Sequence, residues 1–184
     1  MKSNTFLITG VNDSSNPVFK QASDSRIKVI LNETEKIAAQ NDLDPKQTMH
    51  LRLLSEELMC IVPQLIQYGS ATFWIENEGT TYEMHMRVTP KKMPAAPKKT
   101  DNSEVSMMKR ISKAFGNAVT YVKKGKTSMW TLSGYIAELK STDRMANSGA
   151  WDELERSIMA NLADDVTVKT ADKDVELIVT KEFG

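Results

Sequence analysis

Two segments of this chain alternate apolar residues with mostly polar ones, in each case on both sides of a short connection. The apolar positions are Phe73, Ile75, Tyr82, Met84, Met86 and Val88 in the first segment and Val166, Val168, Val175, Leu177 and Val179 in the second. A period of two is typical of a half-buried strand, so each segment predicts an antiparallel hairpin. A hairpin is not stable alone, and its apolar face needs a covering layer.

Apolar residues at helical spacing supply that layer. We expect a short strand at residues 5–9 and helices at about 23–40, 45–65, 103–122, 130–140 and 151–162. Asp44 and Pro45 mark the start of the second helix, because aspartate caps free amides and proline suits the first helical position. Pro63 should kink or end that helix. Helices on one face of a largely antiparallel sheet satisfy this order, so the predicted fold class is α+β.

The length of 184 residues fits one domain, covering residues 1–184. A proline- and lysine-rich stretch at about 90–102 is expected to be a basic loop, and residues 150–183 a C-terminal helix plus hairpin. Cys60 is the single cysteine, which argues against an oxidising compartment. With no recognisable signal peptide and no apolar stretch of ~20 residues, we expect a cytoplasmic location and no membrane contact.

Residues 51–61 combine apolar helical positions with the adjacent acidic residues Glu56 and Glu57. This stretch, the helix before it and the hairpin after it resemble the GHKL (histidine kinase-like) ATPases, especially their anti-sigma-factor serine kinase branch. The resemblance covers about residues 5–90 and, more loosely, the closing hairpin. It implies a GHKL/Bergerat-like two-layer sandwich, in which a glutamate acts as general base and an asparagine four residues later holds magnesium. Residues 150–158 are also similar to a segment of uncharacterised clostridial proteins with the same layout.

The positions at which that family binds nucleotide carry other residues here. With Glu56 in the glutamate position, the magnesium position is Cys60; with Glu57 there, it is Ile61. Neither side chain offers the hard oxygen donor that magnesium requires. The family's aspartate- and glycine-containing motif falls on residues 88–93, which contain neither residue type, and no second glycine-rich loop follows. We therefore expect no cofactor, with ATP and magnesium bound only if the chain is an unusual kinase.

Two functional classes remain open at this point. The first, which we favour, is a non-catalytic or weakly catalytic regulatory protein on a GHKL ATPase-like scaffold that acts by binding another protein, with a homodimer as an open alternative. The second is an ATP-binding serine/threonine protein kinase of anti-sigma-factor type with an unusual nucleotide site. A third, nucleic-acid binding, relies on residues 90–126, which hold ten lysine or arginine residues against two acidic ones. It is the weakest, because the net charge is zero and no groove-reading motif is present.

The individual chemical groups also have plain structural explanations. Glu56 sits where it could pair with Arg52 one turn earlier rather than act as a base. Cys60, between two apolar residues, is expected to be a small buried side chain rather than a reactive thiol. His50 and His85 follow no ligand spacing, so no zinc or other metal site is predicted. His85 alternates with apolar strand residues and should point to solvent or lie beneath a helix.

Overall fold

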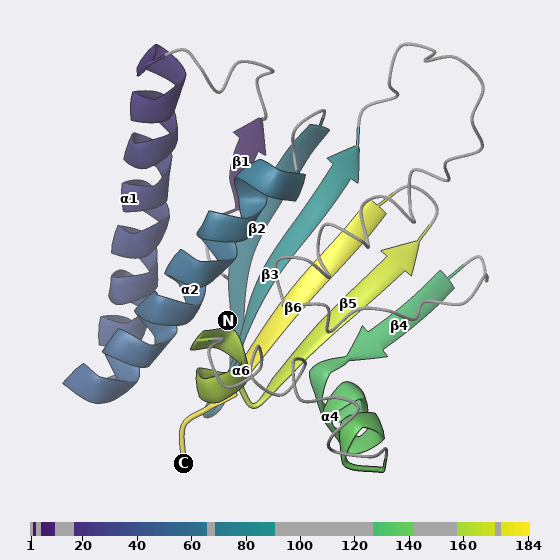
Figure 1. Cartoon of the computed structure of the whole chain (residues 1–184). Helices are drawn as coiled ribbons and strands as arrows, with labels where there is room; N and C mark the ends of the chain where they lie inside the picture. Colours follow the sequence, from purple (N-terminus) through teal and green to yellow (C-terminus); the bar gives the residue numbers. More distant parts are fainter. Residues whose placement is uncertain are drawn as a thin grey trace, which may run out of the picture.

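The computed structural model describes residue 2 and residues 5–9, 17–65, 69–90, 127–141, 158–171 and 174–184. Element labels follow Figure 1. The strands are β1 (Phe6–Thr9), β2 (Gly69–Glu78), β3 (Thr81–Pro90), β4 (Thr127–Thr131), β5 (Asp165–Ala171) and β6 (Asp174–Glu182). The helices are α1 (Pro17–Gln40), α2 (Pro45–Leu65), α4 (Leu132–Ser141) and α6 (Ile158–Leu162). Among these described residues, no helix has the length and apolar character needed to cross a bilayer.

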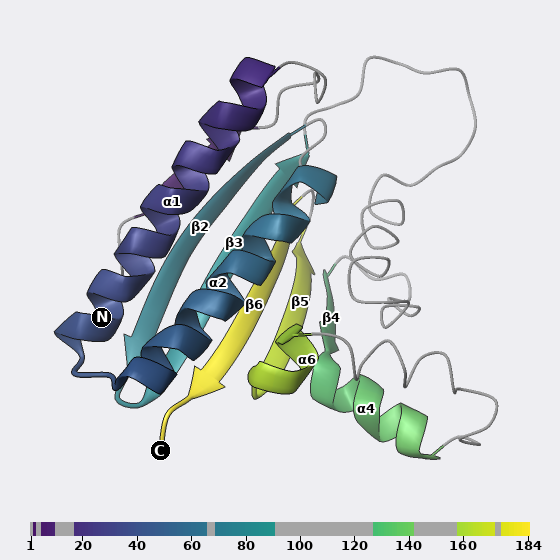
Figure 2. The ribbon, with the colours of Figure 1, turned by 60° about the vertical axis from the view of Figure 1, so that its left-hand side comes forward.

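The strands form one antiparallel sheet in the order β1-β2-β3-β6-β5-β4 (Figure 1). β2 and β3 form the first predicted hairpin, and β5 and β6 form the second. The two hairpins join side by side through β3 and β6, with Met84 opposite Val179. Helices α1 and α2 lie together across one face of the sheet (Figure 2). The fold is therefore α+β with helices on one face of an antiparallel sheet, as the hairpin and helix patterns predicted.

The core lies between the sheet and helices α1 and α2. Thr34 of α1 and Ser55 of α2 are both fully buried where the helices meet. The Thr34 hydroxyl donates to the Ile30 carbonyl at 2.9 Å, and its Oγ1 lies 3.3 Å from Ser55 Oγ. Two buried hydroxyls thus join the helices within an otherwise apolar layer. That layer includes Ile37, Leu51, Leu54 and Leu58 from the helices and Phe73, Ile75, Met84, Met86, Val166, Val168, Leu177 and Val179 from the strands.

Helix α1 ends in a Schellman-type turn. The Leu43 amide donates to the Ala38 carbonyl at 3.0 Å, and Asp42 takes the left-handed conformation with φ of 55°. This turn stops α1 where the apolar periodicity predicted an end. The helix begins at Pro17, however, which is earlier than the expected start near residue 23.

Helix α2 begins with a capping box. The Gln47 amide donates to Asp44 Oδ1 at 2.8 Å, and the Asp44 amide donates to Gln47 Oε1 at 3.0 Å. This pair satisfies two of the amide groups that a helix start leaves free. The predicted start at Asp44 and Pro45 is confirmed, and α2 continues through Pro63 to Leu65.

The expected helix at 130–140 is wrong at its start. Residues Thr127–Thr131 form β4, which pairs with β5, and α4 begins at Leu132. Thr131 Oγ1 accepts a hydrogen bond from the Gly134 amide at 3.2 Å, so this residue ends the strand and caps the helix. Of the expected helix at 151–162, the structure describes α6 alone. The loop expected at 90–102 and the helix expected at 103–122 lie outside the described residues, apart from Pro90 at the end of β3.

Candidate functional site

Helix α2 presents the two positions to which the GHKL resemblance assigns nucleotide chemistry. Glu56 and Cys60 lie one turn apart on an exposed stripe that also carries Met49 and Arg52. Arg52 Nη1 contacts Glu35 Oε1 of α1 at 2.8 Å, so the arginine forms an ion pair between helices instead of the expected pair with Glu56. Cys60 is exposed, which corrects the expectation of a buried side chain. The physical reason is helix geometry, because residue 60 falls just outside the buried stripe of α2.

The electrostatic surroundings of Cys60 do not favour metal binding. Partial burial raises the pKa of the thiol, and the nearby carboxylates of Glu57 and Glu56 raise it further. The thiol is therefore protonated at neutral pH, whereas the thiolate is the form that binds metals. Magnesium in addition prefers hard oxygen ligands. At these positions the helix offers a carboxylate, Glu56, without a second ligand one turn away.

The sheet face opposite α1 and α2 carries a row of buried side chains. Trp74, His85 and Ile178 are cross-strand neighbours on β2, β3 and β6 and are 6%, 7% and 5% exposed. In the part of the chain that the structure describes, no helix crosses this face (Figures 1 and 2). Charged side chains lie over the row instead, with Lys2 Nζ 4.5 Å and Arg87 Cζ 5.3 Å from the centroid of the Trp74 ring. His85 is therefore not exposed, which corrects the expectation that it points to solvent, and none of the described helices lies over it.

His85 is held in place from two sides. Its ring stacks on Trp74, with the ring centroids 4.8 Å apart and the planes 6° from parallel. Its Nδ1 lies 3.1 Å from Glu176 Oε1, and Arg87 Nη2 contacts the other oxygen of Glu176 at 3.2 Å. Its Nε2 is buried and makes no hydrogen bond, although Glu83 Oε2 is 3.3 Å away. The two atoms are close, but a hydrogen bond also requires alignment.

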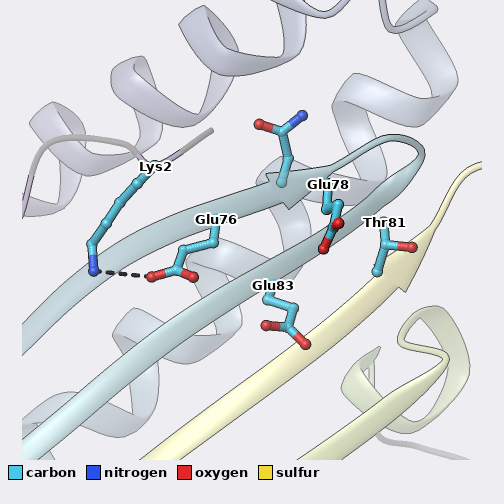
Figure 3. A pocket seen from close by; sticks show the side chains of 6 residues that line it. Lys2, Glu76, Glu78, Thr81 and Glu83 are labelled. Atoms are coloured by element: carbon cyan, nitrogen blue, oxygen red, sulfur yellow. Dashed lines mark ion pairs between the residues drawn. The ribbon is translucent and has the colours of Figure 1, made fainter.

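Two carboxylates flank this histidine. Glu76 and Glu83 lie opposite each other in the β2–β3 hairpin. Glu76 Oε1 pairs with Lys2 Nζ at 2.9 Å and accepts a hydrogen bond from Trp74 Nε1 at 2.8 Å. These two contacts, the Lys2 contact foremost, lower the pKa of Glu76, which is therefore ionised at neutral pH. An open pocket of about 760 Å³ is lined by Lys2, Glu76, Asn77, Glu78, Thr81 and Glu83 (Figure 3).

Glu76, Glu83 and His85 form a compact set of donor atoms, which we call the hairpin triad. Each contributes one donor, and the three donors lie within 4.8 Å of one another. The sequence did not indicate this group, because Glu76, Glu83 and His85 match no familiar histidine and cysteine ligand spacing. The available signal was the turn at Gly79 and Thr80, which fixes Glu76 opposite Glu83 and Trp74 opposite His85.

The sheet separates the hairpin triad from Glu56 and Cys60, the two positions on α2 to which the GHKL resemblance assigns nucleotide chemistry. Glu56, Cys60 and the second histidine, His50, belong to α2, which covers the other face. The structure thus places the predicted residues Glu56 and Cys60 side by side but does not bring His50 and His85 together. No protein-family model matches the chain, and no curated protein matches it at a significant level.

Proposed function

We propose that this chain is a non-catalytic regulatory protein with a GHKL ATPase-like scaffold, which acts in the cytoplasm by binding another protein. Support for the scaffold comes from element order. A strand, two long helices and a hairpin are followed by the strand β4, two further helices and a second hairpin, and the described strands share one antiparallel sheet. Apart from β4, this order is the one implied by the resemblance to the anti-sigma-factor kinase branch.

The observation that carries the non-catalytic assignment is Cys60. Phosphoryl transfer needs a metal ion to neutralise charge across the phosphates and a positioned base to orient the nucleophile. Glu56 supplies a carboxylate on the exposed stripe of α2, but the residue one turn later is a thiol whose pKa is raised. A base at this position has no metal-bound phosphate on which to act. A scaffold without that chemistry retains surface recognition as its means of action.

A kinase of anti-sigma-factor type is the second candidate, and the exposure of Glu56 is the observation that favours it. Calorimetric titration with ATP and GTP, with and without magnesium at physiological salt, distinguishes the two candidates. We expect no heat of nucleotide binding that depends on magnesium and is specific to ATP over GTP. Micromolar ATP binding that is lost in Glu56→Gln and kept in the neighbouring Glu57→Gln would establish the kinase instead. Binding without base selectivity that weakens with rising salt would indicate electrostatic attraction to lysines.

The protein-binding half of the proposal is tested through Cys60, which is exposed and is the single cysteine of the chain. A photoreactive maleimide attached there reports on whatever contacts α2 in a cell extract. We expect one cross-linked protein or a second copy of the chain, confirmed by measuring its affinity for the purified chain. A label at Leu7→Cys in a Cys60→Ser background, on an exposed strand position, is the control. Identical cross-links from both labels would contradict a specific interface on α2.

A further inference from the structure

We propose that the hairpin triad is a binding site for a divalent transition-metal ion of the zinc type. His85 Nε2 and one carboxylate oxygen each from Glu83 and Glu76 supply the three protein ligands. Three protein ligands leave a fourth position for water or for a group from another molecule. The site lies on the sheet face away from α2, so it is independent of the proposed function and of the nucleotide experiment.

The orientation of His85 is the first argument. A carboxylate can only accept, so the 3.1 Å contact with Glu176 assigns a proton to Nδ1 and leaves Nε2 as the ring nitrogen available to bind an ion. Metal-binding histidines regularly use their other ring nitrogen in this way, because a carboxylate partner fixes the tautomer and the ring orientation. Here Arg87 holds Glu176, and Trp74 stacks on the ring. The imidazole is therefore set in place before any ion arrives.

The unpartnered Nε2 is the second argument. The His85 side chain is 9% exposed, and its Nε2 has no hydrogen-bond partner, whereas most buried polar atoms in proteins have one. The atom faces the carboxylate of Glu83 at 3.3 Å without the alignment of a hydrogen bond. A metal ion between the two groups satisfies both at once, because it accepts electron pairs from nitrogen and oxygen alike.

The geometry of the carboxylates allows all three donor atoms to reach one ion. Donors around one tetrahedral zinc ion lie roughly 3.3 Å apart, since each bond is about 2.0–2.2 Å long. The triad donors lie within 4.8 Å, and the side chains of Glu76 and Glu83 are 42% and 45% exposed. These two flexible side chains therefore have room to rotate towards the fixed imidazole. In Figure 3, Glu76 and Glu83 extend from adjacent strands on the same side of the hairpin.

The neighbouring cation sets a limit on affinity and helps to identify the ion. Lys2 and Trp74 both contact Oε1 of Glu76, which leaves Oε2 as the ligand atom. The positive charge of Lys2 opposes the binding of a second cation. The affinity of the site therefore depends on the additional bond from the ring nitrogen of His85. Imidazole suits zinc and its neighbours, whereas magnesium and calcium prefer oxygen alone. We therefore expect Zn²⁺ to bind and Mg²⁺ and Ca²⁺ to bind at least tenfold more weakly.

Calorimetric titration of the full chain with Zn²⁺ tests the site, and Co²⁺ absorption reports on its coordination. We expect one ion per chain. His85→Gln and Glu83→Gln should each lose more affinity than the about 10–100-fold that is typical when a residue supporting a ligand is changed. His50→Gln and Cys60→Ser are matched controls that should bind like wild type. Glu83 is partly exposed, so its variant remains informative if His85→Gln fails to fold. Unchanged binding in Glu83→Gln, loss in Cys60→Ser, or equal affinity for Zn²⁺ and Ca²⁺ would overturn the proposal.

Glu176 provides a separate test as a positioning residue. Glu176→Leu removes the acceptor for Nδ1 and should weaken Zn²⁺ binding about 10–100-fold. Glu176→Gln keeps an acceptor oxygen and should retain most of the affinity. The ¹⁵N resonances of His85 give a readout that a purely structural role would not change, because metal binding at Nε2 shifts that nitrogen in the wild type. Equal Zn²⁺ affinities of the two Glu176 variants, or an unshifted Nε2, would contradict this arrangement.

Discussion

The contact between Thr34 and Ser55 makes a quantitative prediction about how α1 and α2 pack. The Thr34 hydroxyl has one proton, which it donates to Ile30, so Ser55 is the donor in the 3.3 Å contact between the helices. Thr34→Val removes the acceptor of Ser55 with little change of shape. It leaves a fully buried hydroxyl unpaired, which costs about 1–3 kcal/mol.

Removing the second hydroxyl should restore part of that loss. Ser55→Ala alone gives up one hydrogen bond and should cost about 0.5–1.5 kcal/mol. In the double variant no hydroxyl is left unpaired between the helices. We therefore expect the double variant to be destabilised by less than the sum of the single changes, with a coupling energy of about 0.5–3 kcal/mol.

Urea unfolding followed by circular dichroism measures these free energies, provided that the m-value stays constant. Thr48→Val combined with Ser55→Ala is a matched control, because Thr48 Oγ1 makes only a 3.5 Å contact with the Leu43 carbonyl. The control pair should be additive to within about 0.3–0.5 kcal/mol. Additivity of Thr34→Val and Ser55→Ala to the same degree would refute the buried contact and the packing of α1 on α2.

Further predictions concern the core, the hairpin turn and the thiol. Leu58→Ala should cost about 2–5 kcal/mol by urea unfolding, because the side chain is fully buried, and a value below about 0.5 kcal/mol would place it outside the core. Leu7→Ala, at a position 64% exposed, should stay within about 0.5 kcal/mol. Gly79→Ala should cost about 1–2 kcal/mol from backbone conformation alone, since φ is +60° and no atom beyond the adjoining residues lies within 4 Å of the added Cβ. Gly79→Asn should cost less. Cys60 should react with disulfide reagents at pH 7 more slowly than a free cysteine, and Glu57→Gln should accelerate it by lowering the raised pKa; an unchanged rate would contradict this electrostatic effect.

Local patterns were sufficient to predict most elements of the fold. The two hairpins followed from alternation and turn residues, and Asp44 with Pro45 located the start of α2. The same kind of signal, Asn16 before Pro17, is present at the start of α1, but the predicted start near residue 23 followed the apolar periodicity, which begins at Ile27. The strand β4 was missed because its pairing with β5 is a tertiary contact that a five-residue pattern does not reveal.

For the hairpin triad too, part of the arrangement follows from local sequence and part depends on contacts between residues that are distant in sequence. Register within one hairpin places Glu76 opposite Glu83, which the turn position alone allows one to infer. The partner of His85 on its other side, Glu176, comes from β6, and nothing in the local sequence predicts that β3 and β6 are neighbours. Burial of Trp74 on the outer face also depends on long charged side chains that fold over it, such as Lys2 and Arg87.

The pairing of β3 with β6 has a consequence for the rate at which the chain folds. Each hairpin closes a short connection, whereas the β3–β6 contact brings together residues as distant in sequence as Met84 and Val179. Loop closure becomes slower and entropically more costly with separation, so this step should limit refolding. Val179→Ala should then slow refolding in a chevron experiment more than it accelerates unfolding. Until that closure, both strands present unpaired edges on which other chains can pair, so recovery after refolding should decrease as protein concentration rises.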